Sequence, residues 1–196
     1  MAHLPEPSDD ALIRKALCEP ESDAFAQLVR RHQSRLRLYL RSLSGNSSIA
    51  DELAQEALLK VYRSLSRFKF QSSFKTWLMT IARNTFLDQV RLATHVADLQ
   101  RVTDEAHQHV IEAPCIPDTE DGHMLAIDIE RSMQLLSPAE REVIAHCYFA
   151  DLTMDETSKI LGMPLGTVKT HSQRGLKKLR DALTSWQPTF VVKQSK

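Results

Sequence analysis

The sequence predicts an all-α protein, with two small helical domains joined by an acidic linker and a helix-turn-helix in the C-terminal domain. Apolar residues recur at intervals of three and four along most of the chain, which is the spacing of one face of an α-helix. No alternating apolar and polar pattern, which would predict a β-strand, persists anywhere. At 196 residues the chain is long enough for one medium domain or two small ones.

Composition excludes several classes of protein. No apolar run approaches the roughly 20 residues that span a bilayer, and the opening MAHLPEPSDD lacks the basic-then-apolar pattern of a signal peptide. The three cysteines, Cys18, Cys115 and Cys147, are far apart and form no CxxC pair. We therefore expect a cytoplasmic protein with no structural disulfide, no cysteine-based zinc site and no direct membrane insertion.

Charge is unevenly distributed along the chain, although the formal net charge is +0. Residues 1–93 contain 14 Lys and Arg against 10 Asp and Glu, residues 94–135 contain 2 against 9, and residues 136–196 contain 9 against 6. Two basic blocks therefore flank an acidic middle. This pattern indicates two modules that bind a polyanion, joined by a tether of opposite sign.

The first block, residues 8–93, is predicted to form a series of helices. A short helix is expected near Asp9–Leu17 and a longer one from Phe25 to Leu43, followed by SGNSS (44–48), whose serines are candidate N-caps. FQSS (70–73) predicts a loop, and a further helix is expected from Phe74 through Val90. The helix between them is expected to bury the stripe Leu53, Ala54, Ala57, Leu58, Val61, Tyr62, Leu65 and Phe68.

Residues 94–121 are predicted to form the acidic linker. Helical periodicity fades after Thr94, and IEAPCIPDTEDG (111–122) has two prolines, a glycine and four acids. The length exceeds an ordinary helix–helix connection, which indicates a domain boundary. His107, His109 and Cys115 have side chains that can bind a metal, but in a linker we expect them to be solvated.

The second block, residues 122–186, is predicted to be helical again. Helices are expected over residues 124–136 and, after the cap-like Ser137-Pro138, over 138–150. Thr153-x-x-Glu156 has the spacing of a capping box and should open a helix that ends at Gly162. After a tight turn, a last helix is expected from about Pro164 to Ser185, with 187–196 as a frayed tail.

The last two of these helices have the spacing of a helix-turn-helix. Val168, Leu176 and Leu179 can pack the second helix onto the first. The opposite face then carries groups that can contact phosphates and base edges, namely Lys169, Thr170, Gln173, Arg174 and Lys177. A merely solvated basic face is the alternative. A phosphate loop is not matched, and Gly175 should cost about 1 kcal/mol inside a helix unless it permits close packing.

Two segments of the first block have their own surface chemistry. An acidic, polar face formed by Asp51, Glu52, Gln55 and Glu56 is unlike a DNA surface and suits a protein partner, with a plain solvated face as the alternative. In residues 68–91, aromatic and basic residues interleave, which is typical of proteins that hold unstacked bases of a single strand. We expect Trp77 to be core, and the loop Phe70–Phe74 together with Asn84 to form a pocket for a flipped base.

The order of these motifs resembles one known family. DELAQEALLKVYR (51–63) followed by FKTWLMTIARNTFLD (74–88) resembles region 2 of bacterial sigma factors of the extracytoplasmic-function (ECF) family. LSPAEREVI (136–144) followed by LGMPLGTVKTH (161–171) resembles region 4 of the same family. The two resemblances cover about residues 8–93 and 122–186. They imply a factor that binds core RNA polymerase and directs it to promoters through −35 and −10 elements.

The resemblance also implies roles for residues and partners. The acidic face would contact the clamp helices of the largest polymerase subunit, region 4 would reach the flap of the second-largest subunit, and an anti-sigma protein would mask both domains, which could hold the chain at the inner membrane. The acidic tether could lie in the channel for template and nascent RNA, with a solubilising spacer as the alternative. The implied −10 residues are Phe70, Gln71, Ser72, Ser73, Phe74, Lys75, Arg83 and Asn84. The implied −35 residues are Thr167, Lys169, Thr170, His171, Gln173, Arg174 and Lys177.

The sequence favours this function over two others. A conventional helix-turn-helix regulator, acting on DNA without being a polymerase subunit, would leave the aromatic and basic segment without a purpose. No Ser/His/Asp set, paired-carboxylate site or nucleotide loop is recognisable, so we expect no catalytic residue, metal, cofactor or small-molecule substrate. His32 and the His146-Cys147 pair lie on apolar helix faces, where we expect packing roles.

Overall fold

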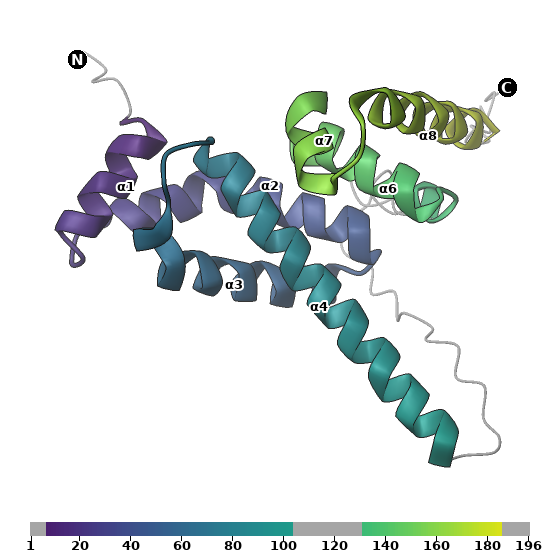
Figure 1. The fold of residues 1–196 in the computed structure, drawn as a ribbon, viewed down its shortest axis with the longest axis horizontal. Coiled ribbons are helices and arrows are strands. Elements are labelled where there is room, and N and C mark those ends of the chain that lie inside the picture. The colour runs from purple at the N-terminus through teal and green to yellow at the C-terminus, as the bar shows by residue number, and fades with distance from the viewer. Residues whose placement is uncertain (1–6, 104–130, 186–196) are drawn as a thin grey trace, which may run out of the picture.

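The structure is a computed structural model that describes residues 7–103 and 131–185 (Figure 1). Within those two ranges every regular element is a helix and none is a strand, as predicted. In the first range these elements are α1 (Asp9–Cys18), α2 (Ala24–Ser44), α3 (Ser47–Ser64), the 3-10 turn η1 (Leu65–Arg67) and α4 (Phe74–Thr103). In the second they are α6 (Pro138–Ile144), the π-helical turn η2 (Ala145–Phe149), α7 (Met154–Leu161) and α8 (Leu165–Ser185).

Local caps set the ends of the first helices. The Ser8 hydroxyl accepts a hydrogen bond from the Ala11 N–H at the start of α1. Gly45 ends α2 in the left-handed conformation, with φ of 67°, which costs glycine little. The N-cap of α3 is Asn46, whose side chain accepts from the Ile49 N–H. The sequence correctly located this break, but the cap is the asparagine rather than one of the serines.

The N-terminal half, α1 to α4, is built around a continuous apolar core. Its largest fully buried side chains come from all four helices and include Ile13, Leu28, Leu36, Tyr39, Leu40, Leu53, Val61, Leu78 and Met79. His32 is a satisfied core histidine, as predicted, since its Nε2 lies 2.7 Å from the Asp9 carboxylate. In the stripe predicted for α3, Leu58 is half-buried and one residue is exposed. Tyr62 is 56 % exposed and its ring contacts Phe25 edge-on.

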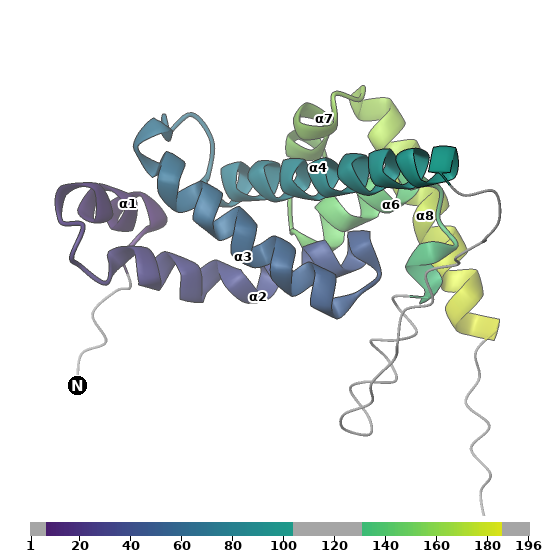
Figure 2. The same cartoon turned by 90° about the horizontal axis from the view of Figure 1, so that it is seen from below.

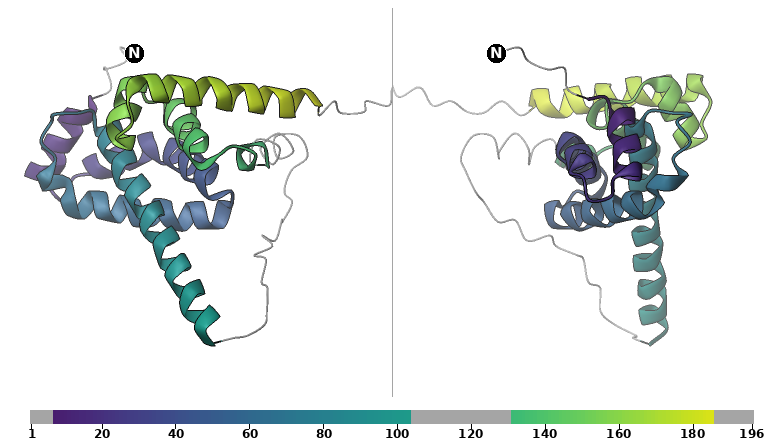
Figure 3. Two further views of the ribbon diagram at one scale, coloured as in Figure 1. Left: turned by 45° about the vertical axis from the view of Figure 1, so that its right-hand side comes forward. Right: turned by 90° about the vertical axis from the view of Figure 1, so that its left-hand side faces the viewer.

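Helix α4 continues ten residues beyond the predicted end of the first block, to Thr103. Residues 74–103 contain no proline or glycine, so nothing in the sequence stops the helix. Its C-terminal part extends past the other helices (Figures 1 and 3). Leu92, just before this extension, is already 65 % exposed.

The C-terminal half begins, in the described chain, at residue 131, so most of the helix predicted over 124–136 lies outside the described residues. Ser137 and Glu140 form a capping box at the start of α6. The helix predicted over 138–150 is interrupted, because the backbone changes from α to π geometry at Ala145. The Ala150 N–H consequently donates to the Ala145 carbonyl, five residues back.

The two halves pack directly against each other (Figure 2). Helix α2 contacts α6 and η2, while polar side chains of α4 bond to residues of α6 and α7. Ala145, Ala150 and Leu152 of the C-terminal half are buried in the same apolar core as α2 and α4. None of the helices in the described chain is both long and apolar enough to cross a membrane.

Candidate nucleic-acid and protein interfaces

Helices α7 and α8 form the predicted helix-turn-helix. The Thr153 hydroxyl and the Glu156 carboxylate make the expected capping box at the start of α7. Gly162 ends α7 in the left-handed conformation, with φ of 64°. The turn is closed by the Ser158 hydroxyl, which donates to the Met163 carbonyl at 2.6 Å. Glycine and proline at this turn therefore set the angle at which α8 leaves α7.

Helix α8 lies with one face packed and one face free, as the sequence predicted. Val168 is fully buried. Leu176 and Leu179 pack on the small core of Met133, Leu136 and Ile144, which lies outside α7, the helix onto which the sequence predicted that they would pack. Helix α8 lies on the opposite side of the molecule from α3 (Figures 1 and 3). Among the predicted −35 residues, Thr167 and His171 are half-buried, and the exposed ones are Lys169, Thr170, Gln173, Arg174 and Lys177.

His171 presents a defined hydrogen-bonding edge on this face. Its Nδ1 is buried and has no hydrogen-bond partner among the described residues. A proton on Nδ1 would be left unsatisfied, whereas a buried lone pair costs less, so we expect the neutral ring to carry its proton on Nε2. In that tautomer His171 offers a donor, which suits an acceptor on a base edge such as guanine N7 or thymine O4.

Gly175 permits close packing rather than flexibility. A Cβ at this position would lie 2.8 Å from Cγ1 of Ile144 and 3.2 Å from its Cδ1. Helix α8 can therefore approach α6 only because residue 175 has no side chain. This contact accounts for a glycine in the middle of α8, where it otherwise weakens helix formation.

Lys178 stabilises its own half of the protein instead of extending the basic face. Its Nζ donates to Glu140 at 2.7 Å, and the Glu140 side chain is 6 % exposed. The hydrogen bond from Lys178 is the main reason that the pKa of Glu140 falls to about 2, with further hydrogen bonds from Ser137 at the capping box. Lys178 therefore ties α8 to the start of α6.

The acidic face of α3 is fully available for a partner. Asp51, Glu52, Gln55 and Glu56 are all exposed. Asp51 pairs with Arg37 of α2 at 3.1 Å and Glu56 with Lys60 at 2.8 Å, so the face carries both signs of charge. Two exposed apolar residues, Leu59 and Tyr62, extend this face along α3.

Two residues of this face were missed by the sequence analysis. Leu59 and Tyr62, 55 % and 56 % exposed, follow Gln55 at intervals of four and three. Because Tyr62 is apolar and has helical spacing, the sequence analysis placed it in the core. It gave Leu59 no role. Exposed apolar residues beside polar ones are typical of protein interfaces, so helical spacing from Gln55 was the signal that could have identified them.

The loop before α4 lines a hollow of about 470 Å³ together with Ser8, Asp9 and Asp10 at the start of α1. Gln71 and Ser72 are exposed on it. The Ser73 hydroxyl caps α4 by accepting from the Thr76 N–H. Phe74 is 2 % exposed and packs edge-on against His32, so its side chain supports the loop from the core.

Phe70 gives this loop its shape. Its φ is 57°, in the left-handed region that non-glycine residues seldom adopt. The Arg14 guanidinium stacks over its ring, 4.4 Å from the centroid, and Phe68 contacts it edge-on. Trp77, expected to be core, is half-buried against Phe68 and Phe74.

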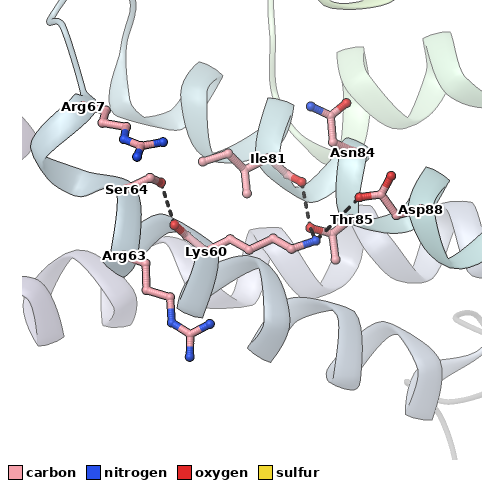
Figure 4. Close-up of a pocket in the computed structure, with 8 residues that line it drawn as sticks. All are labelled: Lys60, Arg63, Ser64, Arg67, Ile81, Asn84, Thr85 and Asp88. Carbon is pink, nitrogen blue, oxygen red and sulfur yellow. Dashed lines mark hydrogen bonds and ion pairs between the residues drawn. The ribbon is translucent and has the colours of Figure 1, made fainter.

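Asn84 lies in a second hollow, of about 480 Å³, between α3 and α4 (Figure 4). The structure therefore does not bring Asn84 into the hollow of the 70–74 loop. Lys60 crosses the second hollow from α3 and donates to the Thr85 hydroxyl at 3.2 Å. Arg63 and Arg67, which the sequence analysis did not single out, add two exposed cations to its lining.

Two predicted −10 residues are bound to the C-terminal half. The Nζ of Lys75 donates to both the main-chain carbonyl and the carboxylate of Asp151. One terminal nitrogen of Arg83, Nη2, donates to both carboxylate oxygens of Glu142, at 3.1 and 2.9 Å. Hydrogen bonds from Lys75, and then from Arg35 of α2, lower the pKa of Asp151.

A metal centre finds no support in the described chain, where no three His, Cys, Asp or Glu residues are grouped so as to hold an ion. His107, His109 and Cys115 lie outside the described residues. His146 is fully buried, as its apolar setting indicated, and the Cys147 sulfur lies 3.5 Å from the Thr157 hydroxyl.

Comparisons with known proteins identify the class to which these interfaces belong. The family profile described as Sigma-70 region 2 matches residues 28–95, and that of Sigma-70, region 4 matches residues 132–181. The chain is 30 % identical over 161 residues to the RNA polymerase sigma factor CarQ of Myxococcus xanthus, an alignment that covers 82 % of this chain and 90 % of that protein. The chain therefore belongs to the sigma-70 family of RNA polymerase sigma factors.

Within that family it belongs to the ECF group. It is 29 % identical over 178 residues to the ECF RNA polymerase sigma factor SigE of Mycolicibacterium smegmatis, covering 91 % of this chain and 68 % of that protein. It is also 29 % identical over 177 residues to the ECF RNA polymerase sigma factor SigW of Bacillus subtilis, covering 86 % and 94 %.

Solved structures agree with the helical architecture. CnrH, solved in complex with the cytosolic domain of CnrY, superposes with a TM-score of 0.67 at 20 % identity, over 92 % of this chain and all of that chain. The sigma factor RpoE of Bartonella quintana, solved with the anti-sigma factor NepR, gives a TM-score of 0.65 at 25 % identity, over 85 % and 100 %.

Proposed function

We propose that this protein binds core RNA polymerase and directs it to promoters by recognising −35 and −10 elements. The observation that carries the proposal is the separation of two different surfaces on a sigma-family fold. One is the free, cationic face of α8, and the other is the acidic and apolar face of α3. A regulator that acts on DNA alone needs the first surface but has no use for the second.

The −35 element would be read by α8 in the major groove. Lys169, Arg174 and Lys177 are exposed and can contact phosphates, while Thr170, His171 and Gln173 can reach base edges. The Thr170 hydroxyl donates to the Gly166 carbonyl at 2.9 Å, which leaves its oxygen as an acceptor toward DNA. Thr167 lies in the first turn of α8. It would therefore lie closest to the DNA backbone where the helix enters the major groove.

Core polymerase would bind the face of α3. We assign Asp51, Glu52, Gln55 and Glu56 to the clamp helices of the largest subunit, with Leu59 and Tyr62 as apolar contacts at the same interface. A mixture of exposed aromatic, aliphatic and charged groups suits a protein interface better than a nucleic acid. Region 4 would make the second contact, with the flap of the second-largest subunit.

The −10 element would be held as a single strand by the start of α4. Gln71 and Ser72 are exposed at the hollow of the 70–74 loop, where a flipped base would enter. The hollow of Asn84 contains Lys60, Arg63 and Arg67, whose charges suit the phosphates of the same strand. We therefore assign the loop and the Asn84 hollow to two successive parts of the melted strand.

The remaining assignments follow from this function. The protein supplies recognition and no catalytic group, it needs no cofactor, and polymerase carries out the chemistry in the cytoplasm. CnrH was solved with the cytosolic domain of CnrY, and RpoE with the anti-sigma factor NepR. We propose an anti-sigma protein as the regulator of this chain too. We assign 8–93 to region 2, 94–121 to a tether and 122–186 to region 4, with the first part of the tether continuing α4.

Transcription in vitro tests the proposal. Purified protein is added to core RNA polymerase with genomic DNA as template, and the 5′ ends of the transcripts are sequenced. We expect start sites that share −35 and −10 sequences and that are absent with core polymerase alone. If the protein neither binds core polymerase nor directs defined start sites, yet binds duplex DNA tightly by itself, it is a conventional helix-turn-helix regulator instead.

A further inference from the structure

The contact between the two halves of the protein uses the same cations that we assign to the −10 strand. Lys75 and Arg83 of α4 are held by Asp151 and Glu142 of the C-terminal half. Their side chains are 27 % and 20 % exposed in this arrangement. Thr76, between them on α4, also donates to the Glu156 carboxylate at 2.6 Å. The N-terminal part of α4 is therefore lined by carboxylates.

A buried polar pair lies beside these ion pairs. His146 of η2 directs Nδ1 at the Glu142 carbonyl, 2.7 Å away, so Nδ1 carries the proton and Nε2 is an acceptor. The Tyr39 hydroxyl of α2 donates to that Nε2 at 3.1 Å. Both side chains are fully buried. The contact is therefore a packed and hydrogen-bonded interface as well as a set of ion pairs.

Carboxylates and phosphates compete for the same groups. A guanidinium binds either anion through the same planar pair of N–H donors, and an ammonium binds either as a point charge. The Nη2 of Arg83 cannot donate to both oxygens of Glu142 and to a DNA phosphate at the same time. The closed arrangement of the two halves and the capture of a single strand by Lys75 and Arg83 therefore exclude each other.

We propose that the closed arrangement is autoinhibitory: the C-terminal half, through Glu142 and Asp151, acts as an internal mimic of the DNA backbone and masks the −10 surface. This inference rests on the proposed function for the role of Lys75 and Arg83. The masking is one-sided, because the exposed −35 face of α8 takes no part in the contact. The closed protein can dock duplex DNA and must open before it holds a melted strand.

Some polar contacts between the two halves are weak or incomplete, which allows the halves to separate. The Nε of Arg83 is buried and lacks a hydrogen-bond partner within the described chain, so closure leaves one donor of the key cation unsatisfied. Asp151 is 63 % exposed in its pair with Arg35, which is 45 % exposed, and water can compete for such a pair. Phosphates of a strand could satisfy all the donors of Arg83 once the halves separate.

The experiment compares the full-length wild type with the double variant Glu142→Gln/Asp151→Asn. Asparagine also tolerates the left-handed backbone of residue 151, where φ is 56°. The double variant Asp155→Asn/Asp181→Asn removes the same amount of charge from exposed positions and serves as the matched control. Small-angle scattering gives the radius of gyration, and anisotropy gives the affinity for a fluorescein-labelled oligothymidylate and for a labelled duplex.

The opening variant should have a larger radius of gyration than wild type and the control, and it should bind the oligothymidylate roughly tenfold more tightly than the control does, because a larger fraction is competent. Its affinity for the duplex should match that of the control. An unchanged radius, or an opened protein with no gain in single-strand affinity over the control, overturns the inference.

A second variant tests whether the effects of the first come only from its altered charge or from unfolding. Tyr39→Phe removes the hydroxyl that donates to His146 and leaves every charge in place. It should also increase the radius of gyration and the single-strand affinity, while unfolding by heat remains cooperative. If Tyr39→Phe stays closed and binds like wild type, the buried pair does not hold the halves together. Neither assay contains polymerase, so a failure of promoter-directed transcription would be a separate result.

Discussion

The two halves of this sigma factor are stabilised in different ways. The N-terminal half has a large apolar core to which four helices contribute side chains. The C-terminal half has a smaller core cluster of its own, Met133, Leu136 and Ile144, and its Ala145, Ala150 and Leu152 are buried in the core of the N-terminal half. It depends on capping boxes, on the Glu140–Lys178 pair and on the missing side chain of Gly175.

This difference shows how one chain can combine a rigid and an adjustable part. The N-terminal half presents the proposed polymerase face on a scaffold whose core comes mainly from its own four helices. The C-terminal half gains stability from a contact that must be given up when the protein opens. The surfaces should therefore respond separately to substitutions, and the contact between the halves should respond to conditions that leave both cores intact.

Acid should have the largest effect, through His146. Burial, with a smaller contribution from Arg83, lowers the pKa of His146 from 6.5 to about 4, although its hydrogen bond to Glu142 opposes the change. Because the folded state binds the proton less readily, the stabilisation is complete above pH 6.5 and is lost as the pH falls from 6.5 toward 4. The loss should approach about 3 kcal/mol, measured by urea unfolding across that range.

A His146→Gln variant is the control for this pH dependence. Its free energy of unfolding should change much less between pH 6.5 and 4.5. Below about pH 4.5 both proteins should lose stability further, because the Glu140 carboxylate, whose pKa is about 2, would then gain a proton on unfolding. Equal slopes for the two proteins above pH 4.5 would show that His146 is not the group that titrates.

The polymerase face should show the next largest effect. Replacing Gln55 and Glu56 together by alanine should weaken binding to core polymerase by about 2 kcal/mol, or roughly 30-fold, because both side chains are exposed at the centre of the proposed interface. Affinity is measured by titration with labelled core polymerase. Binding of duplex −35 DNA should not change. A loss of both activities would contradict the independence of the two halves.

Packing of α8 should be sensitive to a single methyl group. Gly175→Ala places a Cβ 2.8 Å from Ile144 Cγ1, and overpacking of this kind costs about 1–3 kcal/mol against a gain of about 1 kcal/mol in helix propensity. We expect a net loss of about 1 kcal/mol in urea unfolding. Gly166→Ala is the control, since no atom lies within 4 Å of its Cβ, and it should be neutral or slightly stabilising.

The exposed cations of α8 should each have a small effect. Lys169→Ala should weaken duplex binding roughly threefold whatever the sequence, and should reduce the slope of log affinity against log salt by about 1. Fluorescence anisotropy over a salt series measures both quantities. A change in the preferred bases, rather than in the salt slope, would assign Lys169 to base recognition instead of phosphate contact.

Local signals predicted much of this architecture. Thr153 with Glu156, and Gly162, set the bounds of α7 correctly because caps act within a few residues. The burial of Val168 and the exposure of the cations around it followed from helical spacing alone. The family resemblance then placed these elements in the right order on a sigma-factor fold.

What the sequence did not predict depends on partners distant in the chain or absent from it. The end of α4 has no proline or glycine as a stop signal, so periodicity alone placed its end too early. Tyr62 lies at the edge of its stripe, where helical spacing does not decide exposure. The pair of Lys75 with Asp151 joins residues 76 positions apart and leaves no local pattern.

The π-helical turn at Ala145–Phe149 makes the contact between the halves dependent on chain length. A π turn accommodates one residue more than an α turn, and each residue of an α-helix rotates the chain by about 100°. Deleting one residue there would turn Asp151 and Leu152 away from α2 and α4 without changing any side chain. Relatives that differ by a single insertion at this point would thus share the same fold and the same α8 helix. They would differ in whether their two halves pack against each other.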